Sequence, residues 1–317
     1  MERYQDLRQA GVTRAELAGR VRRGDLVRVR RGAFRQPGAL SPEQEHLELV
    51  AAMAGSMVQG AVVSHASAAV LHGLPVPKDV LGRMFVTTPG VGRVTRHLHR
   101  YDATVPESGL VPLGRAREFG ELLKRAPSGA TDLAKLPVTS LARTAVDLAR
   151  CLAYHHGVAV IDAALRAGVD REELRAEVEL ARRRPGNARA RLAVDFGDGR
   201  AESPGESWSR VQLAALGLPM PKLQTKVFDA GGEFVARVDF DWEDYGVVGE
   251  FDGDIKYGRL LTPCQDINTV IRKERAREER IRRQGRWVIR WITKEVFNPK
   301  VFKDIIESGL RNGVRRR

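Results

Sequence analysis

The sequence predicts an α+β protein, because helix-like and strand-like segments occupy separate parts of its 317 residues. Residues 139–150 place apolar side chains at helical spacing, whereas residues 233–242 alternate apolar and polar side chains as a strand does. A hydrophobic fraction of 43% with 29% charged residues excludes wholesale disorder. At about 100–200 residues per domain, the length indicates two or three domains.

The charge is uneven along the chain. Lys and Arg total 53 against 40 Asp and Glu, a formal net charge of +13. Residues 1–36 hold ten Arg against four acids, and residues 272–290 hold nine basic side chains against three acids. Solvated helix faces are one interpretation of such runs. Binding of a polyanion is the other interpretation. The preference for Arg over Lys favours phosphate, which the planar guanidinium binds through two oxygens.

No feature of the sequence indicates a membrane or an oxidising compartment. No apolar run approaches the roughly 18–20 residues of a membrane helix. Residues 1–11 lack the apolar core of a secretory signal. Cys151 and Cys264 are too far apart in sequence for a disulfide framework or a CxxC metal site. We therefore expect a cytoplasmic protein without a membrane partner.

Residues 1–37 are predicted to form a winged-helix DNA-binding region. Thr13 and Glu16 form a capping box that begins a helix, Gly24 ends it, and residues 26–35 alternate as a small hairpin. In a winged helix-turn-helix such a helix enters the major groove, and the hairpin contacts phosphates. The expected apolar stripe of the helix is Ala15, Leu17, Ala18 and Val21. The predicted DNA-binding side chains are Arg14, Arg20, Arg23, Arg28, Arg30 and Arg31.

These residues also resemble a known family. Gly-Val-Thr-Arg at 11–14 and Val-Arg-Arg-Gly-Asp-Leu-Val-Arg-Val-Arg-Arg-Gly-Ala-Phe-Arg at 21–35 resemble the N-terminal domain of the AbiEi-type antitoxins of type IV toxin–antitoxin systems. The resemblance implies a module that binds operator DNA and represses its own promoter. It makes a nucleotidyltransferase-like toxin a candidate partner, and a homodimer is a candidate assembly.

Residues 38–190 are predicted to form a mixed α/β middle domain. A helix begins at Pro42, a second covers residues 64–74, and strands at 85–88 and 94–100 flank a Pro-Gly turn. The stretch resembles the body that follows the winged helix in actinobacterial AbiEi-like proteins. The sequence at 182–187 is typical of a linker, which places a domain boundary near residues 185–200.

Two histidines of the middle domain leave an alternative open. His97 and His99 lie on one face of the expected strand, where imidazoles can ligate a metal. No cysteine or carboxylate lies at ligand spacing from them. A polar surface is therefore the favoured interpretation.

Residues 200–317 are predicted to form an α-β-β-β-α-β domain. The expected elements are a helix from 203 to 217, strands at 222–228, 233–242 and 247–252, a basic helix at 263–284 and a strand at 286–291. The predicted DNA-binding side chains of the basic helix are Arg272, Lys273 and Arg280.

The central hairpin of this domain is expected to gather carboxylates. If Trp242 pairs with Val247, then Asp239 lies opposite Glu250 on one face. Opposed carboxylates repel each other, whereas Mg²⁺ prefers hard oxygen ligands and takes one or two carboxylates. A solvated acidic face is the alternative. The same register places four acids together: Asp239, Asp241, Glu250 and Asp252.

An acidic cluster within a basic domain favours metal-dependent cleavage of nucleic acid. Basic side chains would hold the phosphate backbone, and Asp239, Glu250 and Asp252 would hold Mg²⁺ or Mn²⁺. The metal activates water and stabilises charge at phosphorus. Lys256 would orient the water or stabilise the developing charge.

The same residues resemble the PD-(D/E)xK nuclease superfamily, specifically the DUF559 branch related to very-short-patch-repair (Vsr-like) endonucleases. The matching residues are Val238-Asp239, Glu250-Phe251-Asp252-Gly253 and Arg272-Lys273-Glu274-Arg275. The resemblance implies a restriction-endonuclease-like fold in which Asp239 and Glu250 are the metal-binding pair. Glu206 would be the acid of the first helix, and Gln224 would support the site from the first strand. Asp252 stands where the superfamily has lysine, so Lys256 would be its substitute.

Two hypotheses and a weaker third follow. The first is a DNA-binding protein whose Mg²⁺-dependent nuclease-fold domain hydrolyses phosphodiester bonds. The second is a non-catalytic AbiEi-type antitoxin or transcriptional repressor with a degenerate nuclease domain. RNA as the substrate has less support, because only 6% of the residues are aromatic.

Overall fold

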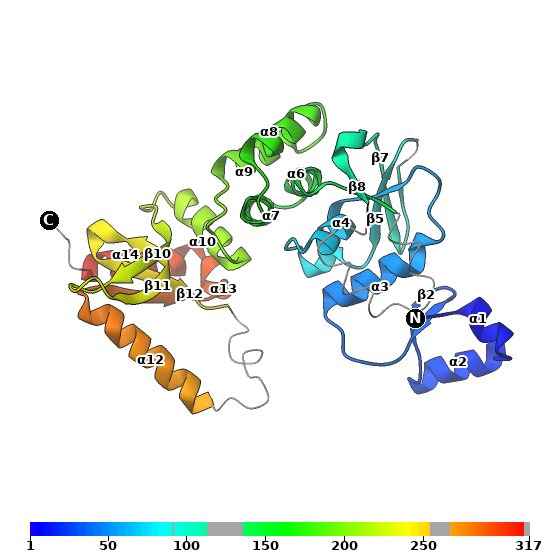
Figure 1. The fold of residues 1–317 in the computed structure, drawn as a ribbon, viewed down its shortest axis with the longest axis horizontal. Helices are drawn as coiled ribbons and strands as arrows, with labels where there is room; N and C mark the ends of the chain where they lie inside the picture. Colours follow the sequence, from blue (N-terminus) through cyan, green and yellow to red (C-terminus); the bar gives the residue numbers. More distant parts are fainter. Residues whose placement is uncertain (91, 113–135, 254–266, 314–317) are drawn as a thin grey trace. The chain divides into compact units, whose positions relative to one another are not determined.

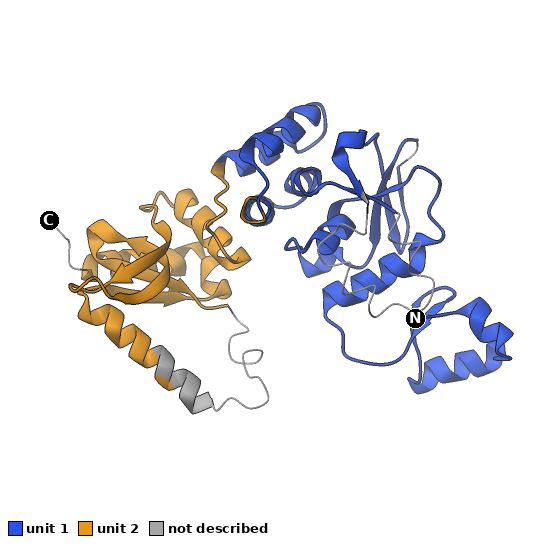
Figure 2. Cartoon of the chain, in the orientation of Figure 1, with its two compact units in different colours: residues 1–164, 168–195 blue, residues 165–167, 196–317 orange. Residues whose placement is uncertain are grey.

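The computed structural model of the protein describes residues 1–90, 92–112, 136–253 and 267–313 (Figure 1). It is a mixed α/β structure whose described strands form three sheets, in agreement with the predicted α+β class. The chain divides into two compact units, which Figure 2 distinguishes by colour. The first holds residues 1–164 and 168–195, and the second holds residues 165–167 and 196–317. None of the described helices combines the length and apolarity needed to cross a membrane.

The first unit begins with two short helices and a three-stranded antiparallel sheet of order β1-β3-β2. Its elements are β1 (Glu2–Arg3), α1 (Tyr4–Gln9), α2 (Arg14–Arg23), β2 (Val27–Arg30) and β3 (Ala33–Arg35). Thr13 caps α2 by accepting the Glu16 N–H at 3.2 Å, and Gly24 ends it with φ of 80°. These ends confirm the predicted helix. The antiparallel pairing of β2 with β3 confirms the predicted hairpin.

The predicted apolar stripe of α2 is only partly correct. The core of this region consists of Leu7, Leu17, Leu26 and Phe34. Leu17 is buried and Val21 is half-buried, whereas Ala15 and Ala18 are exposed. A single short helix and a small hairpin cover only one narrow side of α2, so the alanines stay in solvent.

The middle of the first unit is a six-stranded sheet of order β6-β7-β5-β4-β9-β8. Its elements are α3 (Pro42–Ala54), β4 (Val62–Val63), α4 (His65–His72), η1 (Lys78–Val80), β5 (Met84–Thr88), β6 (Arg93–Val94), β7 (Leu98–Asp102), η2 (Glu107–Gly109), β8 (Leu110–Pro112) and β9 (Pro137–Thr139). Ser41 and Gln44 complete the capping box of α3. The predicted strands at 85–88 and 94–100 do not form a simple hairpin. β5 and β7 pair in parallel, and β6 returns antiparallel at the edge beside β7.

Helices complete the first unit. They are α6 (Leu141–Cys151), α7 (Tyr154–Arg166), α8 (Arg171–Leu180) and α9 (Asn187–Phe196). The segment at 182–187, predicted as a linker, instead packs on α6. Arg150 Nε donates to the Pro185 carbonyl oxygen at 3.2 Å, and a Cβ on Gly186 would overlap the carbonyl of Arg150. The change of unit at residues 195 and 196 lies within the range 185–200 predicted for the boundary.

The second unit has the predicted α-β-β-β-α-β order, followed by two helices. Its elements are α10 (Pro204–Ala215), β10 (Lys222–Phe228), β11 (Phe234–Trp242), η5 (Glu243–Tyr245), β12 (Val247–Phe251), α12 (Ile267–Arg283), β13 (Trp287–Trp291), α13 (Thr293–Val296) and α14 (Pro299–Asn312). The sheet order is β10-β11-β12-β13, with β10, β11 and β12 antiparallel and β12 parallel to β13. As predicted, Trp242 pairs with Val247.

Two apolar cores lie in the second unit. The larger contains Phe240, Trp242 and Trp291, packed with Phe302 and Ile306 of α14. A Cβ on Gly249 would lie 2.5 Å from Trp291 Cη2, so glycine lets the aromatic rings lie against β12. The smaller core contains Ile281 of α12 and these strand residues: Val227, Val235, Ala236, Val238 and Val248.

Candidate active site in the second unit

In the middle of the paired strands β10 and β11, the apolar side chains change from one face of the sheet to the other. Leu223 belongs to the larger core and Val227 to the smaller one, although residues four apart on a regular strand share a face. On β11, Phe240 belongs to the larger core and Val238 to the smaller one, although residues two apart on a regular strand also share a face. Gln224 has φ of 52°, in the left-handed region that a non-glycine strand residue rarely adopts. The strands therefore carry a local distortion at Gln224.

This distortion places the Gln224 amide between two carboxylates. Gln224 Nε2 donates to Glu206 Oε2 at 2.9 Å and to Asp239 Oδ1 at 3.2 Å. The other oxygen of Asp239 accepts the Phe251 N–H at 3.0 Å. Both carboxylate oxygens of Asp239 are thus held, one from β10 and one from the end of β12. The orientation of Asp239 is set by three strands together.

Glu206 contacts both the start of α10 and the side chain of Gln224. Its backbone N–H donates to Ser203 Oγ at 3.2 Å, which caps α10. Its carboxylate accepts the Ser203 hydroxyl at 2.8 Å and the Glu202 N–H at 2.9 Å, in addition to the amide of Gln224. The side chain is only 5% exposed. Glu206 therefore both caps the helix and fixes Gln224.

Glu250 is almost completely buried, at 2% exposed, and is neutralised by two arginines. Arg277 Nη1 of α12 lies 2.6 Å from Glu250 Oε1, and Arg290 Nη2 of β13 lies 2.9 Å from Oε2. Burial raises the pKa of Glu250, the two guanidinium groups lower it, and the nearby charge of Asp239 raises it further. Asp239 and Glu250 are thus close enough to interact electrostatically.

The expected face of four carboxylates is not formed. Asp241 is buried and pairs with Arg286 at 2.8 Å, and burial raises its pKa although Arg286 lowers it. Asp252 lies 3.5 Å from Arg290 Nη1. In the part of the chain that the structure describes, no three His, Cys, Asp or Glu side chains are grouped to hold a metal. The acids form ion pairs with arginines instead: Asp241 pairs with Arg286, and Arg290 is shared by Glu250 and Asp252.

The chemistry of the donors that remain fits a hard divalent cation. Asp239 and Glu250 offer carboxylate oxygens, and Mg²⁺ is usually held by one or two carboxylates with water and phosphate as its other ligands. The two guanidinium groups at Glu250 show that this position already favours positive charge. Their side chains are 32% and 27% exposed, so both can reach solvent if they leave the carboxylate.

The predicted DNA-binding residues of the second unit differ in their exposure and contacts. Arg272 is exposed on α12, and Arg280 Nη2 donates to the Phe234 carbonyl oxygen at 2.8 Å. Lys256 lies outside the described residues, as does the side chain of Lys273. Sequence reasoning missed Arg277 and Arg290 as the partners of Glu250. The parallel pairing of β12 with β13, which sets Glu250 beside Arg290, is visible only in the structure.

The arginines of α2 make local contacts. Arg14 Nε donates to the Tyr4 hydroxyl at 3.0 Å, and Arg23 pairs with Asp25 at 2.9 Å. Arg20 is half-buried. Arg14 and Arg23 are exposed, so their exposed ion pair and hydrogen bond contribute little stability and leave the side chains accessible.

The hairpin offers a separate basic surface. Arg28 and Arg31 are exposed, and Arg30 donates to Ser56 Oγ at 3.0 Å. The pKa of His97 is lowered by partial burial and by the charges of Arg96, Arg30 and Arg28. The positive potential of the hairpin therefore extends to the loop between β6 and β7.

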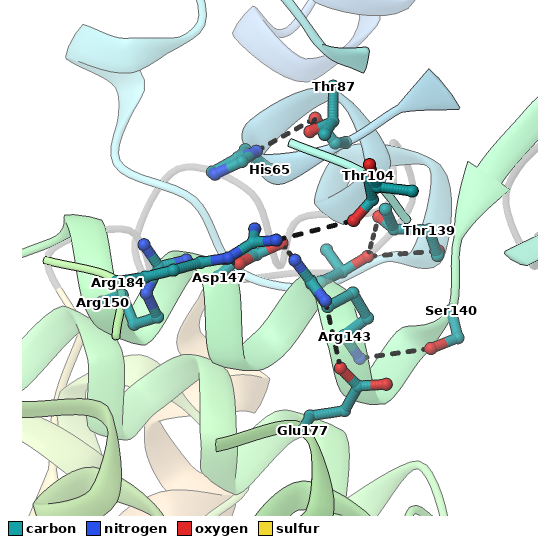
Figure 3. A network of polar contacts seen from close by, with 12 residues as sticks. His65, Thr87, Thr104, Thr139, Ser140, Arg143, Asp147, Arg150, Glu177 and Arg184 are labelled. Carbon is teal, nitrogen blue, oxygen red and sulfur yellow. Dashed lines mark hydrogen bonds and ion pairs between the residues drawn. The ribbon is translucent and has the colours of Figure 1, made fainter. Parts of the chain in front are cut away.

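Sequence reasoning also missed a buried polar network on α6 (Figure 3). Asp147, 1% exposed, accepts from Arg143 Nε at 2.7 Å and from Arg150 Nη1 at 2.6 Å. Arg143 Nη1 also lies 3.5 Å from Glu177 Oε2 of α8. The network joins α6 to α8 inside the first unit. Its only sequence signal was a row of charges in a segment otherwise read as amphipathic.

Comparison with known proteins gives relatives without a stated activity. No family model matches the chain. The chain is 34% identical over 242 residues to uncharacterized protein MT2308 of Mycobacterium tuberculosis strain CDC 1551 / Oshkosh. The same figures hold for uncharacterized protein Rv2248 of strain ATCC 25618 / H37Rv. Each alignment covers 76% of this chain and 79% of the relative.

Proposed function

Since the chain belongs to the same family as these two Mycobacterium tuberculosis proteins, whose names state no activity, we propose its function from its own side chains: it binds DNA and hydrolyses phosphodiester bonds in a reaction that depends on Mg²⁺ or Mn²⁺. The cytoplasm is the compartment in which we propose that it acts. The resemblance of its ends to AbiEi-type antitoxins and to PD-(D/E)xK nucleases supports the same proposal.

One observation carries the nuclease proposal. Beside a buried Glu250, Asp239 is held at one oxygen by Gln224, whose backbone is strained, and at the other by the Phe251 N–H. A strained backbone and a buried carboxylate beside a second acid both lower stability, and proteins keep such features mostly where function needs them. A purely structural sheet would be more stable with a regular strand and apolar side chains here.

Each residue of the site has a proposed role. Asp239 and Glu250, with Asp252 nearby, would hold the divalent cation. The chemistry that such a cation supplies is activation of water and neutralisation of charge on the phosphate. Gln224 and Glu206 position Asp239 through the contacts of 2.9 and 3.2 Å.

The basic residues around the site would bind the DNA backbone. Arg277 and Arg290 stand beside Glu250, and a guanidinium can bind two phosphate oxygens at once. Arg272 extends the exposed basic face of α12. Lys256 and Lys273 stay candidates on sequence grounds alone.

The first unit would supply a second DNA contact. The element order β1-α1-α2-β2-β3, with β1 paired to β3, is compatible with a winged helix-turn-helix. We propose that α2 is its recognition helix and that Arg28, Arg30 and Arg31 on the hairpin contact phosphates.

The test is a divalent-cation titration with plasmid and oligonucleotide DNA. Purified full-length protein should cut DNA with Mg²⁺ or Mn²⁺ and not with a chelator. Asp239→Asn and Glu250→Gln should lose cleavage and retain DNA binding in a gel shift. Asp244→Asn is the matched control, because Asp244 is an exposed carboxylate in η5 outside the site. Cleavage at the wild-type rate by both site variants would contradict the assignment.

A second candidate function is a DNA-binding regulator without catalysis. The observation that favours it is the neutralisation of Glu250 by two arginines, which a silent site could retain for stability. This function predicts a specific gel shift on DNA upstream of the protein's own gene, with no cleavage at any metal concentration. Co-purification of a nucleotidyltransferase-like toxin would support it further, and light scattering would test for a homodimer. RNA in the same assays tests the alternative substrate.

A further inference from the structure

A cavity of about 400 Å³ lies in the first unit, and its lining includes no residue of the proposed nuclease site. The side chains of its lining that matter here are His65, Arg83, Phe85, Arg96, His99 and Tyr101. They come from α4, from β5 and β7 of the central sheet, and from the loops beside these strands. Leu148 and Leu152 add an apolar wall from α6 and the residue after it. The volume falls in the range of small-molecule sites, about 300–1,000 Å³.

Three aromatic rings in the lining are stacked in a row. The ring centroids of His65 and Tyr101 are 3.7 Å apart with 9° between the planes. Those of Tyr101 and His99 are 4.2 Å apart with 10° between the planes. Phe85 lies beside the row, 5.4 Å from His99 and 6.4 Å from Tyr101. The parallel register of β5 and β7 sets Phe85 beside His99, so the sheet itself builds this platform.

The deep end of the row is held in an unusual backbone conformation. His65 has φ of 49°, in the left-handed region, at the first position of α4. Its Nδ1 lies 3.0 Å from Ser64 Oγ, and Ser64 Oγ also accepts the Thr87 hydroxyl at 2.8 Å. Figure 3 shows His65 and Thr87 close together near the α6 network. Such strain persists where surrounding contacts over-determine it, and it is concentrated at functional sites.

The charges around the cavity suit an anionic ligand with an uncharged ring. Burial lowers the pKa of His65 to about 4, and burial together with Arg83 lowers that of His99, so both rings are neutral near pH 7. Arg83 and Arg96 are exposed cations in the lining. Asp79 is the carboxylate of the lining and can accept hydrogen bonds from an amine or hydroxyl.

We infer that this cavity binds a nucleotide, with the base stacked on the outer face of His99 at the end of the ring row and the phosphate held by Arg83 and Arg96. Histidine, tyrosine and phenylalanine rings stack on any nucleobase, and arginine binds phosphate in a bidentate way. An inorganic anion would make no contact with the aromatic rings, and an apolar ligand would make no ion pair with the arginines. The platform and the cations together favour a ligand with both parts.

The nucleotide can come from two sources, which share this chemistry. One is a free mononucleotide, and the other is an unpaired nucleotide within a nucleic-acid strand. Arg96 adds to the same positive potential at His97 as Arg28 and Arg30 of the hairpin. A strand bound to the hairpin would therefore find favourable potential leading to the cavity. The experiment distinguishes the two sources.

The test is isothermal titration calorimetry of the full-length protein, without divalent cations so that cleavage plays no part. The titrants are AMP, GMP, CMP and UMP, adenosine, inorganic phosphate and short single-stranded oligonucleotides. The variants are His99→Ala, which shortens the ring row, and Arg83→Ala, which removes a cation. Arg93→Ala is the matched control, because Arg93 is an exposed arginine of β6 outside the lining. Thermal melts verify that every variant is folded.

A nucleotide site predicts saturable binding of at least one mononucleotide, with adenosine and phosphate each weaker than the nucleotide. His99→Ala and Arg83→Ala should each weaken binding by about tenfold or more, as expected for the loss of one stacking or phosphate contact, while Arg93→Ala leaves it unchanged. Binding of oligonucleotides alone, with the same sensitivity to His99→Ala, assigns the site to an unpaired nucleotide. The proposal is overturned if no titrant binds saturably, if phosphate binds as well as the nucleotides, or if the folded His99→Ala and Arg83→Ala proteins bind like wild type.

Discussion

Gln224 Nε2 lies 3.2 Å from Asp239 Oδ1, and it reaches this oxygen from a backbone with φ of 52°. The hydrogen bond to Asp239 and the strained backbone of Gln224 occur together, because the backbone conformation sets the direction of the side chain. A regular strand residue would project along the normal alternation of β10, and the left-handed conformation changes that direction. The candidate metal ligand is therefore oriented at a cost in backbone energy, which mutation can measure.

We predict that Gln224→Gly is more stable than Gln224→Ala. Both changes remove the hydrogen bonds to Glu206 and Asp239, but only glycine adopts positive φ without steric cost. A left-handed non-glycine residue costs roughly 1–2 kcal/mol, and the extra chain entropy of glycine offsets part of it. Urea denaturation should therefore give Gln224→Gly a free energy of unfolding about 1 kcal/mol higher. Equal or reversed stabilities would show that the Gln224 backbone is not strained.

We predict that the hairpin arginines contribute phosphate contacts to DNA binding. Arg28→Ala combined with Arg31→Ala removes two exposed cations without touching a core residue. The plot of log K against log salt should become shallower by about 0.9 for each lost phosphate contact. Arg182→Ala, an exposed arginine after α8 that pairs with Glu179, is the control and should not change this slope. Unchanged slopes for the double variant would remove the hairpin from the DNA interface.

We predict that the first unit depends on the Asp147 network for stability. Asp147→Asn would leave Arg143 and Arg150 buried without their carboxylate, and loss of one partner of a buried pair costs roughly 3–5 kcal/mol. Glu172→Gln breaks an exposed pair with Arg175 and should cost at most about 1 kcal/mol. Thermal and urea unfolding of the two variants gives the comparison. Similar losses in both would mean that the network does not stabilise the unit.

We predict that His65 makes the protein less stable as the pH falls from about 6.5 to about 4. Folded His65 takes up a proton only near pH 4, because burial disfavours the charged ring, whereas unfolded histidine takes it up near 6.5. Between these values the unfolded state binds more protons, so stability decreases on acidification by up to about 1.4 kcal/mol per pH unit.

The comparison protein for this prediction is His65→Asn, since asparagine tolerates the left-handed backbone and does not titrate. The difference in unfolding free energy between wild type and His65→Asn should change across this pH window and be constant above it. Subtraction cancels the titration of the other histidines. A constant difference throughout the window would show that His65 protonates equally well when folded.

Local patterns predicted much of the fold. The cap at Thr13 and the proline at Pro42 gave the starts of two helices, and alternation gave the strands of the second unit in order. The hairpin register was confirmed from Trp242↔Val247 to Phe240↔Gly249. These features depend on residues near one another in sequence, so their signals are readable without a structure.

Longer-range features escaped prediction. Alternation contains no sign that Gln224 would leave the regular strand conformation. It also does not show that arginines would pair with Asp241 and Glu250, so the four carboxylates expected on one face are not grouped among the described residues. The parallel pairing of β5 with β7 replaced an apparent hairpin, because β6 occupies the sheet edge beside β7. In each case the outcome depended on what a segment packs against.

The sequence by itself determined where the charges, helix ends and strand alternations lie. Its alternation suggested Asp239 and Glu250 as a carboxylate pair, and the resemblance to PD-(D/E)xK nucleases added Glu206 and Gln224 to this candidate site. Only the tertiary structure decided which arginine neutralises which acid and that a stacked row of rings borders a cavity in the first unit. The physical reason is that a buried charge or ring is stabilised by partners that the fold brings close, and these can lie far away in sequence. For Glu250 those partners lie 27 and 40 residues further along the chain, at Arg277 and Arg290.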